Sequence, residues 1–340
     1  MQLCYCRTRI PNFGDDLNSW LWHALIPDSF TLESTWILLG VGSIIDRTTI
    51  EVYPGKRNWV VLGSGVGYNL LPAINEGSWN FLAVRGPLSA RVLNLEPKAA
   101  VTDSAVLVGA LPDCSPLTED ERNGIVFMPH HSIVDMDGWK LACAEAGVEF
   151  LDPSLDSRAL VQRIRRSRLV LADAMHSAIV ADTLRVPWIP LSSSAQTSTF
   201  KWLDWTLSMN VEYTPIILPD ISPTEKSRAD GLWWSGEVFR TESLDQNAVM
   251  ASFLDKQNVV KNAWKRNYER GLHFTYRKIQ PRRLKRMLKR SARKPEYHDR
   301  AVKALRDAAK SRSFLSAEAT YRDRLNAMME RLKTMQKLVA

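Results

Sequence analysis

The chain has 340 residues, enough for two domains with cores of their own, and its 45% content of apolar residues is ordinary for a globular protein. No apolar run approaches the roughly 18 residues of a spanning helix, and the four cysteines form no C-x-x-C pair, which argues against a transmembrane segment and a zinc site. The net charge of +8 is uneven, because residues 256–340 contain about 25 Lys and Arg against about 7 Asp and Glu.

These features predict a cytoplasmic protein. The N-terminal residues MQLCYCRTRIPNFGDD become polar after a few positions, which is not typical of a signal peptide. The cysteines are accordingly expected to be reduced thiols with structural roles. A basic tail would still allow peripheral contact with the inner face of the cytoplasmic membrane.

Strand and helix signals alternate through residues 1–115. The short strand QLCYCR leads through the loop NFGDD into an amphipathic helix, and TWILLGVG and NWVVLGSGVG are apolar runs that end in glycines. Such runs are typical of buried parallel strands. NFLAVRGPLSARVL predicts a further strand and a helix that begins at Pro87. The alternation predicts a Rossmann-like α/β unit with a parallel sheet.

A polar linker with two prolines, LPDCSPLTEDERNG, precedes a second unit of the same kind over residues 120–220. Its predicted strands are GIVFM, VEFLDP, RLVLAD and PWIPL, and they alternate with the helices DGWKLACAEAG, DSRALVQRIRRS, AMHSAIVADTLRV and TSTFKWLDWTLSMN. Two such units are expected to face each other across a cleft at the carboxyl ends of their strands.

The rest of the chain has a different pattern. TEKSRADGLWWSG is interpreted as a loop, and residues 245–340 are predicted to form a basic helical extension. Within it, RRLKRMLKRSARK is cationic with apolar side chains on one side, and AEATYRDRLNAMMERLKTMQKLV predicts a long amphipathic helix. The extension could be a solvated helical bundle or could lie on an anionic membrane surface. Because no base-reading motif is present, we expect no nucleic-acid partner.

The most informative candidate is His176, in RLVLADAMHSAIVADTLRVPWIPL. It follows a buried strand and stands near the third position of the next helix, which Asp173 could cap. The free N–H groups and the dipole of a helix start favour anions. A histidine there, with Ser177 beside it, could donate to a bound anion or transfer a proton. The alternative is a histidine that is hydrogen-bonded within its own loop.

Two loops of the first unit could also contact a ligand. NFGDD places Asn12, Asp15 and Asp16 between a strand and a helix, where acids can equally be ordinary helix caps. GSGVG places Ser64 and Gly65 directly after a strand, where backbone could approach a ligand closely. Its spacing is not that of a dinucleotide fingerprint.

Further candidates stand at other strand ends. Arg85, in VRGP, could hold a phosphate or carboxylate bidentately, or could form an ion pair at the domain surface. Asp103 could orient Arg85 or cap the next turn. Either His130 or His131 could face the cleft, since two neighbouring side chains do not easily do so together. No metal site is evident, although the acidic loop would allow a divalent ion.

In their order and spacing, NFGDDLN, GSGVG, VRGPLSARVL, TDSAVLVG and AMHSAIVADTLRVPWIPL resemble the polysaccharide pyruvyl transferase family, in particular the exopolysaccharide ketal transferases. The resemblance covers roughly residues 1–215. It implies a two-domain fold similar to the B-type glycosyltransferases and phosphoenolpyruvate as the donor substrate, with no cofactor. The implied product is a pyruvate ketal across two hydroxyls of a sugar, formed with release of phosphate.

The resemblance also implies roles for single residues. His176 matches the family's histidine at the helix start and would protonate C3 of the donor, while Arg85 matches an arginine associated with the donor. Beyond what the resemblance implies, we expect an acid of NFGDD, Asp15 or Asp16 and first of all Asp15, to receive a hydroxyl proton or to orient the acceptor. The further residues expected to contact substrates are Asn12, Asp16, Ser64, Gly65, His130 and Ser177.

The chain departs from the family pattern at one position. Family members often have an arginine two residues before the histidine, and here that residue is Ala174. One anion contact would then come from another residue, with His130, His131 and Arg168 as the candidates.

The acceptor in this family is commonly a lipid-linked oligosaccharide at the cytoplasmic face of the membrane, which would give the basic extension a role beside anionic lipid. Two alternatives stay open. A nucleotide-sugar-dependent glycosyltransferase could have the same fold, although no nucleoside site is evident. A non-catalytic carbohydrate- or membrane-binding protein would need little more than the 12 tryptophans and the basic extension.

Overall fold

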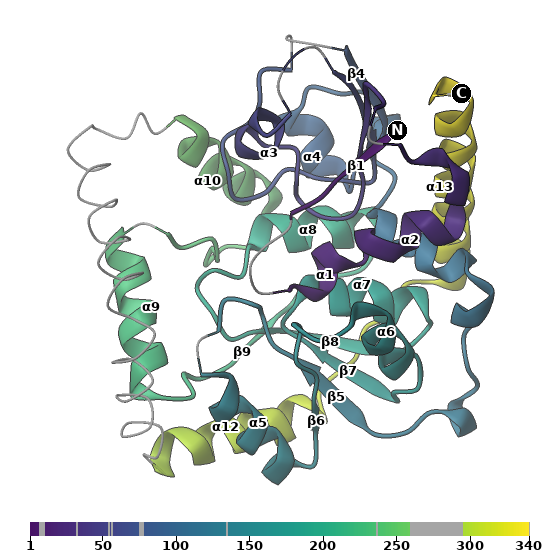
Figure 1. The fold of residues 1–340 in the computed structure, drawn as a ribbon. Coiled ribbons are helices and arrows are strands. Elements are labelled where there is room, and N and C mark those ends of the chain that lie inside the picture. The colour runs from purple at the N-terminus through teal and green to yellow at the C-terminus, as the bar shows by residue number, and fades with distance from the viewer. Residues whose placement is uncertain are drawn as a thin grey trace.

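The computed structural model describes residues 1–6, 11–31, 33–53, 55, 57–74, 78–133, 135–235, 237–258 and 295–339 (Figure 1). Its first sheet has the order β1-β2-β3-β4, and all neighbouring strands are parallel. The strands are β1 (Gln2–Cys4), β2 (Trp36–Leu39), β3 (Asn58–Leu62) and β4 (Ser78–Ala83).

The second sheet has the order β6-β5-β7-β8-β9 and is also parallel throughout. The strands are β5 (Ile125–Met128), β6 (Glu149–Phe150), β7 (Leu169–Ala172), β8 (Trp188–Ser192) and β9 (Ile216–Ile217). The predicted α/β class with two parallel sheets is confirmed. The glycosyltransferase-B-like arrangement and the domain boundaries stay predictions.

Helices connect the strands in both units. The α-helices of the first unit are α1 (Phe13–Asp16), α2 (Asn18–Leu25), α3 (Arg47–Glu51) and α4 (Pro87–Val92). Those that follow are α5 (Met136–Ala146), α6 (Ser157–Arg165), α7 (Met175–Thr183), α8 (Thr199–Ser208), α9 (Pro223–Ser235), α10 (Gln246–Asn258), α12 (Pro295–Ala308) and α13 (Glu318–Val339). Short 3₁₀ helices are η1 (Pro27–Ser29), η2 (Pro97–Ala99), η3 (Ser104–Ala110), η4 (Pro112–Cys114) and η5 (Glu119–Glu121).

Helix α9 corrects the prediction of a loop for TEKSRADGLWWSG. Pro223 occupies the first helical position, where its missing N–H costs nothing, and the hydroxyl of Ser222 accepts a hydrogen bond from the Glu225 N–H at 3.4 Å. After Pro223 the apolar residues of this helix are confined to positions 229–234, which is too short a stretch for periodicity to reveal the helix.

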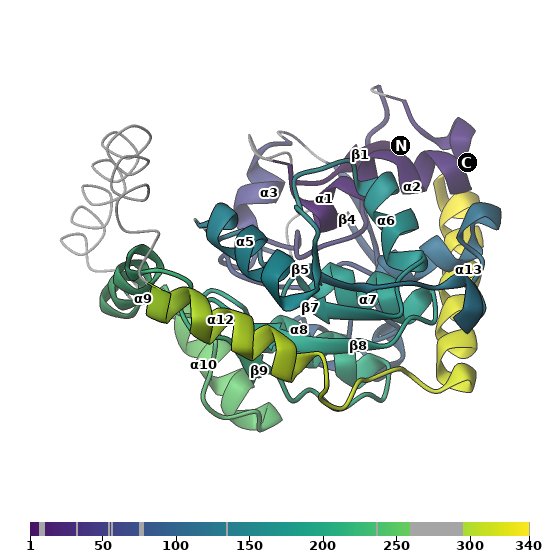
Figure 2. The same cartoon turned by 90° about the horizontal axis from the view of Figure 1, so that it is seen from below.

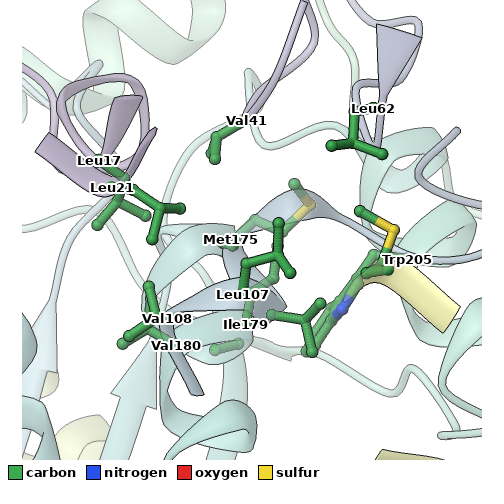
Figure 3. Close-up of a cluster of buried hydrophobic side chains, with 14 of the residues drawn as sticks. Leu17, Leu21, Val41, Leu62, Leu107, Val108, Met175, Ile179, Val180 and Trp205 are labelled. Carbon is green, nitrogen blue, oxygen red and sulfur yellow. The ribbon is translucent and has the colours of Figure 1, made fainter. Parts of the chain in front are cut away.

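Helix α7 lies in the middle of the molecule and is buried along its whole length (Figures 1 and 2). It contacts β7 and β8 on one side and α1 and η3 of the first unit on the other. Figure 3 shows Met175, Ile179 and Val180 of α7 among Leu21 and Leu107 of the first unit. One hydrophobic core therefore crosses the boundary between the two sheets, and it holds the first turn of α7 in a fixed position.

The C-terminal helices pack on both units rather than extending from them (Figures 1 and 2). Helix α12 lies against α5, with Val302 and Leu305 in the core of the second unit. Helix α13 lies against η3, β3 and β4, where Met328 and Leu332 join the first core. The predicted long helix at the C-terminus is thus confirmed, and its apolar face is covered.

The segment between α12 and α13 is tied to the centre of the molecule. Phe314 forms an antiparallel bridge with Trp188 of β8. Asp182, at the end of α7, accepts hydrogen bonds from the Ser316 N–H at 2.8 Å and the Ser316 hydroxyl at 2.5 Å. We call residues 295–339, which join the two units in this way, the C-terminal strap.

The cationic stretch RRLKRMLKRSARK, residues 282–294, lies outside the described residues, so its predicted contact with a membrane surface stays a prediction. Within the described part of the chain, no helix combines the length and the apolar character needed to cross a bilayer.

Candidate functional site

The NFGDD segment, which was predicted as a loop, forms helix α1 with Asn12 as its N-cap. It comes together with His176 at the junction of the two units, although they are far apart in the sequence. His176 is the second residue of α7, and its ring packs directly on Gly14 of α1. A Cβ atom on Gly14 would stand only 2.0 Å from Nδ1 of His176, so only glycine leaves space for the ring. This contact places two of the segments predicted to bind ligands, NFGDD and the start of α7, in one site.

His176 faces a buried carboxylate. Its Nε2 lies 3.7 Å from Oδ2 of Asp103, and these two atoms are buried without a hydrogen-bond partner among the described residues. Asp103 caps η3 with its other oxygen, which accepts from the Ala105 N–H at 2.9 Å. Buried polar atoms are rarely left unsatisfied, and such atoms are typical of functional sites. Of the two roles considered for Asp103, the cap is confirmed, and orientation of Arg85 is wrong.

The start of α7 differs from the prediction. Its N-cap is Ala174, which has no side-chain cap, and Ser177 Oγ donates to the Ala174 carbonyl at 2.6 Å. Asp173 does not cap the helix, because its carboxylate accepts from the backbone N–H groups of His130 at 2.7 Å and Ser193 at 3.1 Å. Burial raises the pKa of Asp173. Its function is to tie together the loops that follow β5, β7 and β8.

Lys201 is a site residue that the sequence analysis missed. It is the third residue of α8, and its ammonium lies over the Tyr68 ring, 4.5 Å from the centroid. No carboxylate within the described ranges forms an ion pair with it, although Asp15 and Asp103 both raise its pKa. Burial, followed by the charge of Arg85, lowers the pKa of Lys201 to about 8. Like His176, it stands in the first turn of the helix that follows a strand, here α8 after β8.

The two adjacent histidines differ in exposure. His130 is buried, with Nδ1 2.7 Å from Ser132 Oγ and Nε2 3.5 Å from the Tyr68 hydroxyl, whereas the His131 side chain is exposed. Burial, followed by the charges of His131, Lys201 and Arg228, holds the pKa of His130 well below its usual value. His130 is therefore a neutral hydrogen-bonding group at this junction.

Arg85 is fully buried and bound by the protein itself. Its Nε donates to Asp204 Oδ2 at 3.0 Å, Nη1 to Ser43 Oγ at 2.5 Å, and Nη2 to the Val66 carbonyl at 2.7 Å. Gly65 leaves room for this arrangement, since a Cβ there would lie 2.5 Å from the Arg85 Cζ. These contacts join the end of β4 to α8. The predicted role of Arg85 and Gly65 in binding a substrate stays a prediction.

The remaining candidates of the first unit are also hydrogen-bonded. Asn12 Nδ2 donates to Asp15 Oδ2 at 2.6 Å, and the Asn12 N–H donates to Asp16 Oδ2 at 3.0 Å. Burial raises the pKa of Asp16, which closes its own helical turn. Ser64 Oγ donates to the Gly42 carbonyl at 3.0 Å. Asp15 is thus held by one amide, and its other oxygen, Oδ1, lies beside Gly42, 3.3 Å from where a Cβ atom would stand.

Arg168 does not belong to this site. It precedes β7, whereas His176 follows the same strand, and its Nε donates to the Arg122 carbonyl at 3.1 Å. The four residues of β7 separate the two side chains by roughly 13 Å along the strand. The suggestion that Arg168 could supply an anion contact is therefore wrong.

The contact between Gly14 and His176 gives a stability prediction. Gly14→Ala is expected to lower the free energy of unfolding by about 1–3 kcal/mol, because the new methyl group overlaps the ring and the core around it must shift. Gly231→Ala in α9 is the matched control, since a Cβ there meets no atom within 4 Å and alanine favours helix. Urea denaturation measures both. A Gly14→Ala protein as stable as the wild type would contradict the packing described here.

One known protein is similar in sequence to this chain over most of its length. The chain is 33% identical over 235 residues to the succinoglycan biosynthesis protein ExoV of Rhizobium meliloti (strain 1021), and the alignment covers 69% of this chain and 73% of that protein. No family model matches the chain, and no solved structure matches it. The aligned length exceeds that of either parallel-sheet unit alone, so the similarity extends over most of the molecule. On this identity and coverage, the chain belongs to the same family as that succinoglycan biosynthesis protein, a family of the polysaccharide pyruvyltransferase type.

Proposed function

We propose that this protein is a ketal pyruvyltransferase that transfers the enolpyruvyl group of phosphoenolpyruvate to two hydroxyls of a saccharide and releases phosphate. The acceptor is a sugar of an exopolysaccharide or of its lipid-linked precursor. The observation that carries the proposal is the unsatisfied His176–Asp103 pair, which lies at the junction of the units against α1, the helix that contains Asp15. Membership in the family of a succinoglycan biosynthesis protein supports a saccharide acceptor.

The first step adds a sugar hydroxyl to C2 of phosphoenolpyruvate. A C2–O bond forms, the hydroxyl loses its proton, and C3 gains one, so that the transition state resembles an oxocarbenium ion. An acid aimed at C3 and a base near the hydroxyl therefore both accelerate the step. In our proposal His176 supplies the proton to C3, and Asp15 receives the hydroxyl proton.

The second step closes the ketal. A neighbouring sugar hydroxyl loses its proton and forms a second bond to C2, the bond between C2 and the phosphate oxygen breaks, and phosphate leaves and takes up that proton. The N–H groups in the first turn of α7 favour the negative charge of the donor. Asp103, whose Oδ2 lies 3.7 Å from Nε2 of His176, is placed to pair with the ring when it carries the proton that is transferred to C3.

The donor can be identified by thermal unfolding in the presence of phosphoenolpyruvate and, in parallel, of nucleotide sugars. Phosphoenolpyruvate at 100 times its dissociation constant is expected to stabilise the protein by about 2.7 kcal/mol, which is a readily measured shift. Nucleotide sugars are expected to give no shift. Stabilisation by a nucleotide sugar alone would instead favour a glycosyltransferase. Stabilisation by neither ligand would favour the remaining alternative, a non-catalytic binding protein.

A further inference from the structure

Lys201 is a charged residue at the junction whose ammonium forms no ion pair with a carboxylate of the described residues. Its backbone N–H bonds to the Ser198 hydroxyl at 3.3 Å, which fixes the residue in the first turn of α8. Its side chain is half-buried, and the absence of a Cβ on Gly67 leaves space beside its Cδ, at 3.7 Å. The only side-chain contact that the described residues give its ammonium is the face of the Tyr68 ring.

The charged neighbours of Lys201 are engaged elsewhere. Asp15 accepts a hydrogen bond from Asn12, Asp103 faces His176, and Arg85 is paired with Asp204. His130 and His131, on the loop after β5, and Arg228, on α9, add no negative charge. A half-buried ammonium without a carboxylate partner costs free energy, and a ligand anion would offset that cost.

We infer that Lys201 binds the phosphate group of the donor, with the Tyr68 ring holding the ammonium in place. This inference rests on the proposed function. A lysine ammonium is a compact point charge that suits a phosphate dianion, and its attraction to the ring face is a cation–π contact. In the second step the C2–O bond to phosphate breaks, the electron pair goes to the phosphate oxygen, and Lys201 stabilises the negative charge that develops there.

The inference gives donor binding a defined pH dependence. Burial lowers the pKa of Lys201 to about 8, so the ammonium of the free enzyme loses its proton as the pH rises through that value. A bound phosphate favours the protonated form, and binding must therefore weaken above pH 8. For one proton the dissociation constant is expected to increase about tenfold between pH 7 and pH 9.

Calorimetric titration with phosphoenolpyruvate, inorganic phosphate and pyruvate tests this assignment. Lys201→Met is expected to weaken binding of phosphoenolpyruvate and of phosphate by at least about tenfold at pH 7, and to leave binding of pyruvate unchanged. Lys201→Arg is expected to retain binding and to lose the decline between pH 7 and pH 9, since arginine stays charged. Lys140→Met, at an exposed position of α5, is the control and should match the wild type.

The possible outcomes separate this inference from the proposed function. Equal affinities of the wild type and Lys201→Met for phosphate, or an effect on pyruvate alone, would overturn the assignment of Lys201. If phosphate binding depends on Lys201 but phosphoenolpyruvate does not bind the wild type, Lys201 is confirmed as an anion-binding residue and phosphoenolpyruvate is excluded as the donor. Because methionine has a similar volume and no charge, we expect Lys201→Met to fold, and its thermal midpoint verifies this.

Discussion

Replacing His176 with asparagine is expected to reduce the rate of ketal formation by about 10²–10⁴-fold, while the affinity for phosphoenolpyruvate changes little. The physical reason is that asparagine keeps a polar group at the start of α7 but cannot deliver a proton to C3. Phosphate release, measured at saturating donor and acceptor, gives the turnover number. Calorimetry on the same variant gives the donor affinity.

A second histidine provides the control for this experiment. His298 lies on the exposed surface of α12, where Nε2 is 2.8 Å from Glu145 Oε2, and no step of the proposed reaction involves it. His298→Asn is therefore expected to turn over at the wild-type rate. Equal turnover by His176→Asn and the wild type would remove His176 from the chemistry, whatever the donor proves to be.

The largest loss of stability is expected from Asp204→Ala. Asp204 and Arg85 are both fully buried, and Asp204 also accepts hydrogen bonds from the Ser89 N–H at 2.9 Å and the Ser89 hydroxyl at 2.5 Å. Removing the carboxylate leaves the guanidinium charge buried without its counterion. Breaking a buried pair in this way typically costs about 3–5 kcal/mol. Urea denaturation with matched slopes gives the change in the free energy of unfolding.

Asp307→Ala is the matched control for the buried pair. Asp307 pairs with Lys303 at 2.6 Å, one turn away on the surface of α12, and both side chains are exposed. Exposed pairs of this kind contribute little, because water and salt screen them. If Asp204→Ala were no less stable than Asp307→Ala, the ion pair between Arg85 and Asp204 would not be the structural link between β4 and α8 that the geometry indicates.

The sheets were predictable because their strands are continuous apolar runs. WILL, NWVVL and LVLA are each buried along almost their whole length, and a run of this kind has few folded states other than a central parallel strand. The two-residue strand β9 was not predicted, because two apolar residues are too few to show a periodic pattern. Helix α9 was not predicted for a similar reason, because its apolar residues after Pro223 are confined to positions 229–234.

Sequence patterns identified which loops matter but not how their side chains pair. His176 and the NFGDD loop were both predicted, and the structure brings them together through Gly14. The partner of Arg85 was not predictable, because Asp204 lies 119 positions further along the chain and no local pattern marks it. Asp173 illustrates the opposite error. An acid before a helix usually predicts a cap, and here three donors from two other loops, His130, Ser193 and Thr197, bind its oxygens instead.

The C-terminal strap has a consequence for how the molecule is made. Helices α12 and α13 are synthesised after both sheets, yet they cover apolar surface on each of them. Some two hundred residues separate the first unit from α13 in the sequence. At a synthesis rate of roughly 5–20 residues per second, β3 and β4 therefore stay uncovered on the ribosome until these residues have been made. During that interval its uncovered side chains are open to chaperones and to misassembly. Nascent chains halted before residue 295 would be the species most prone to aggregate.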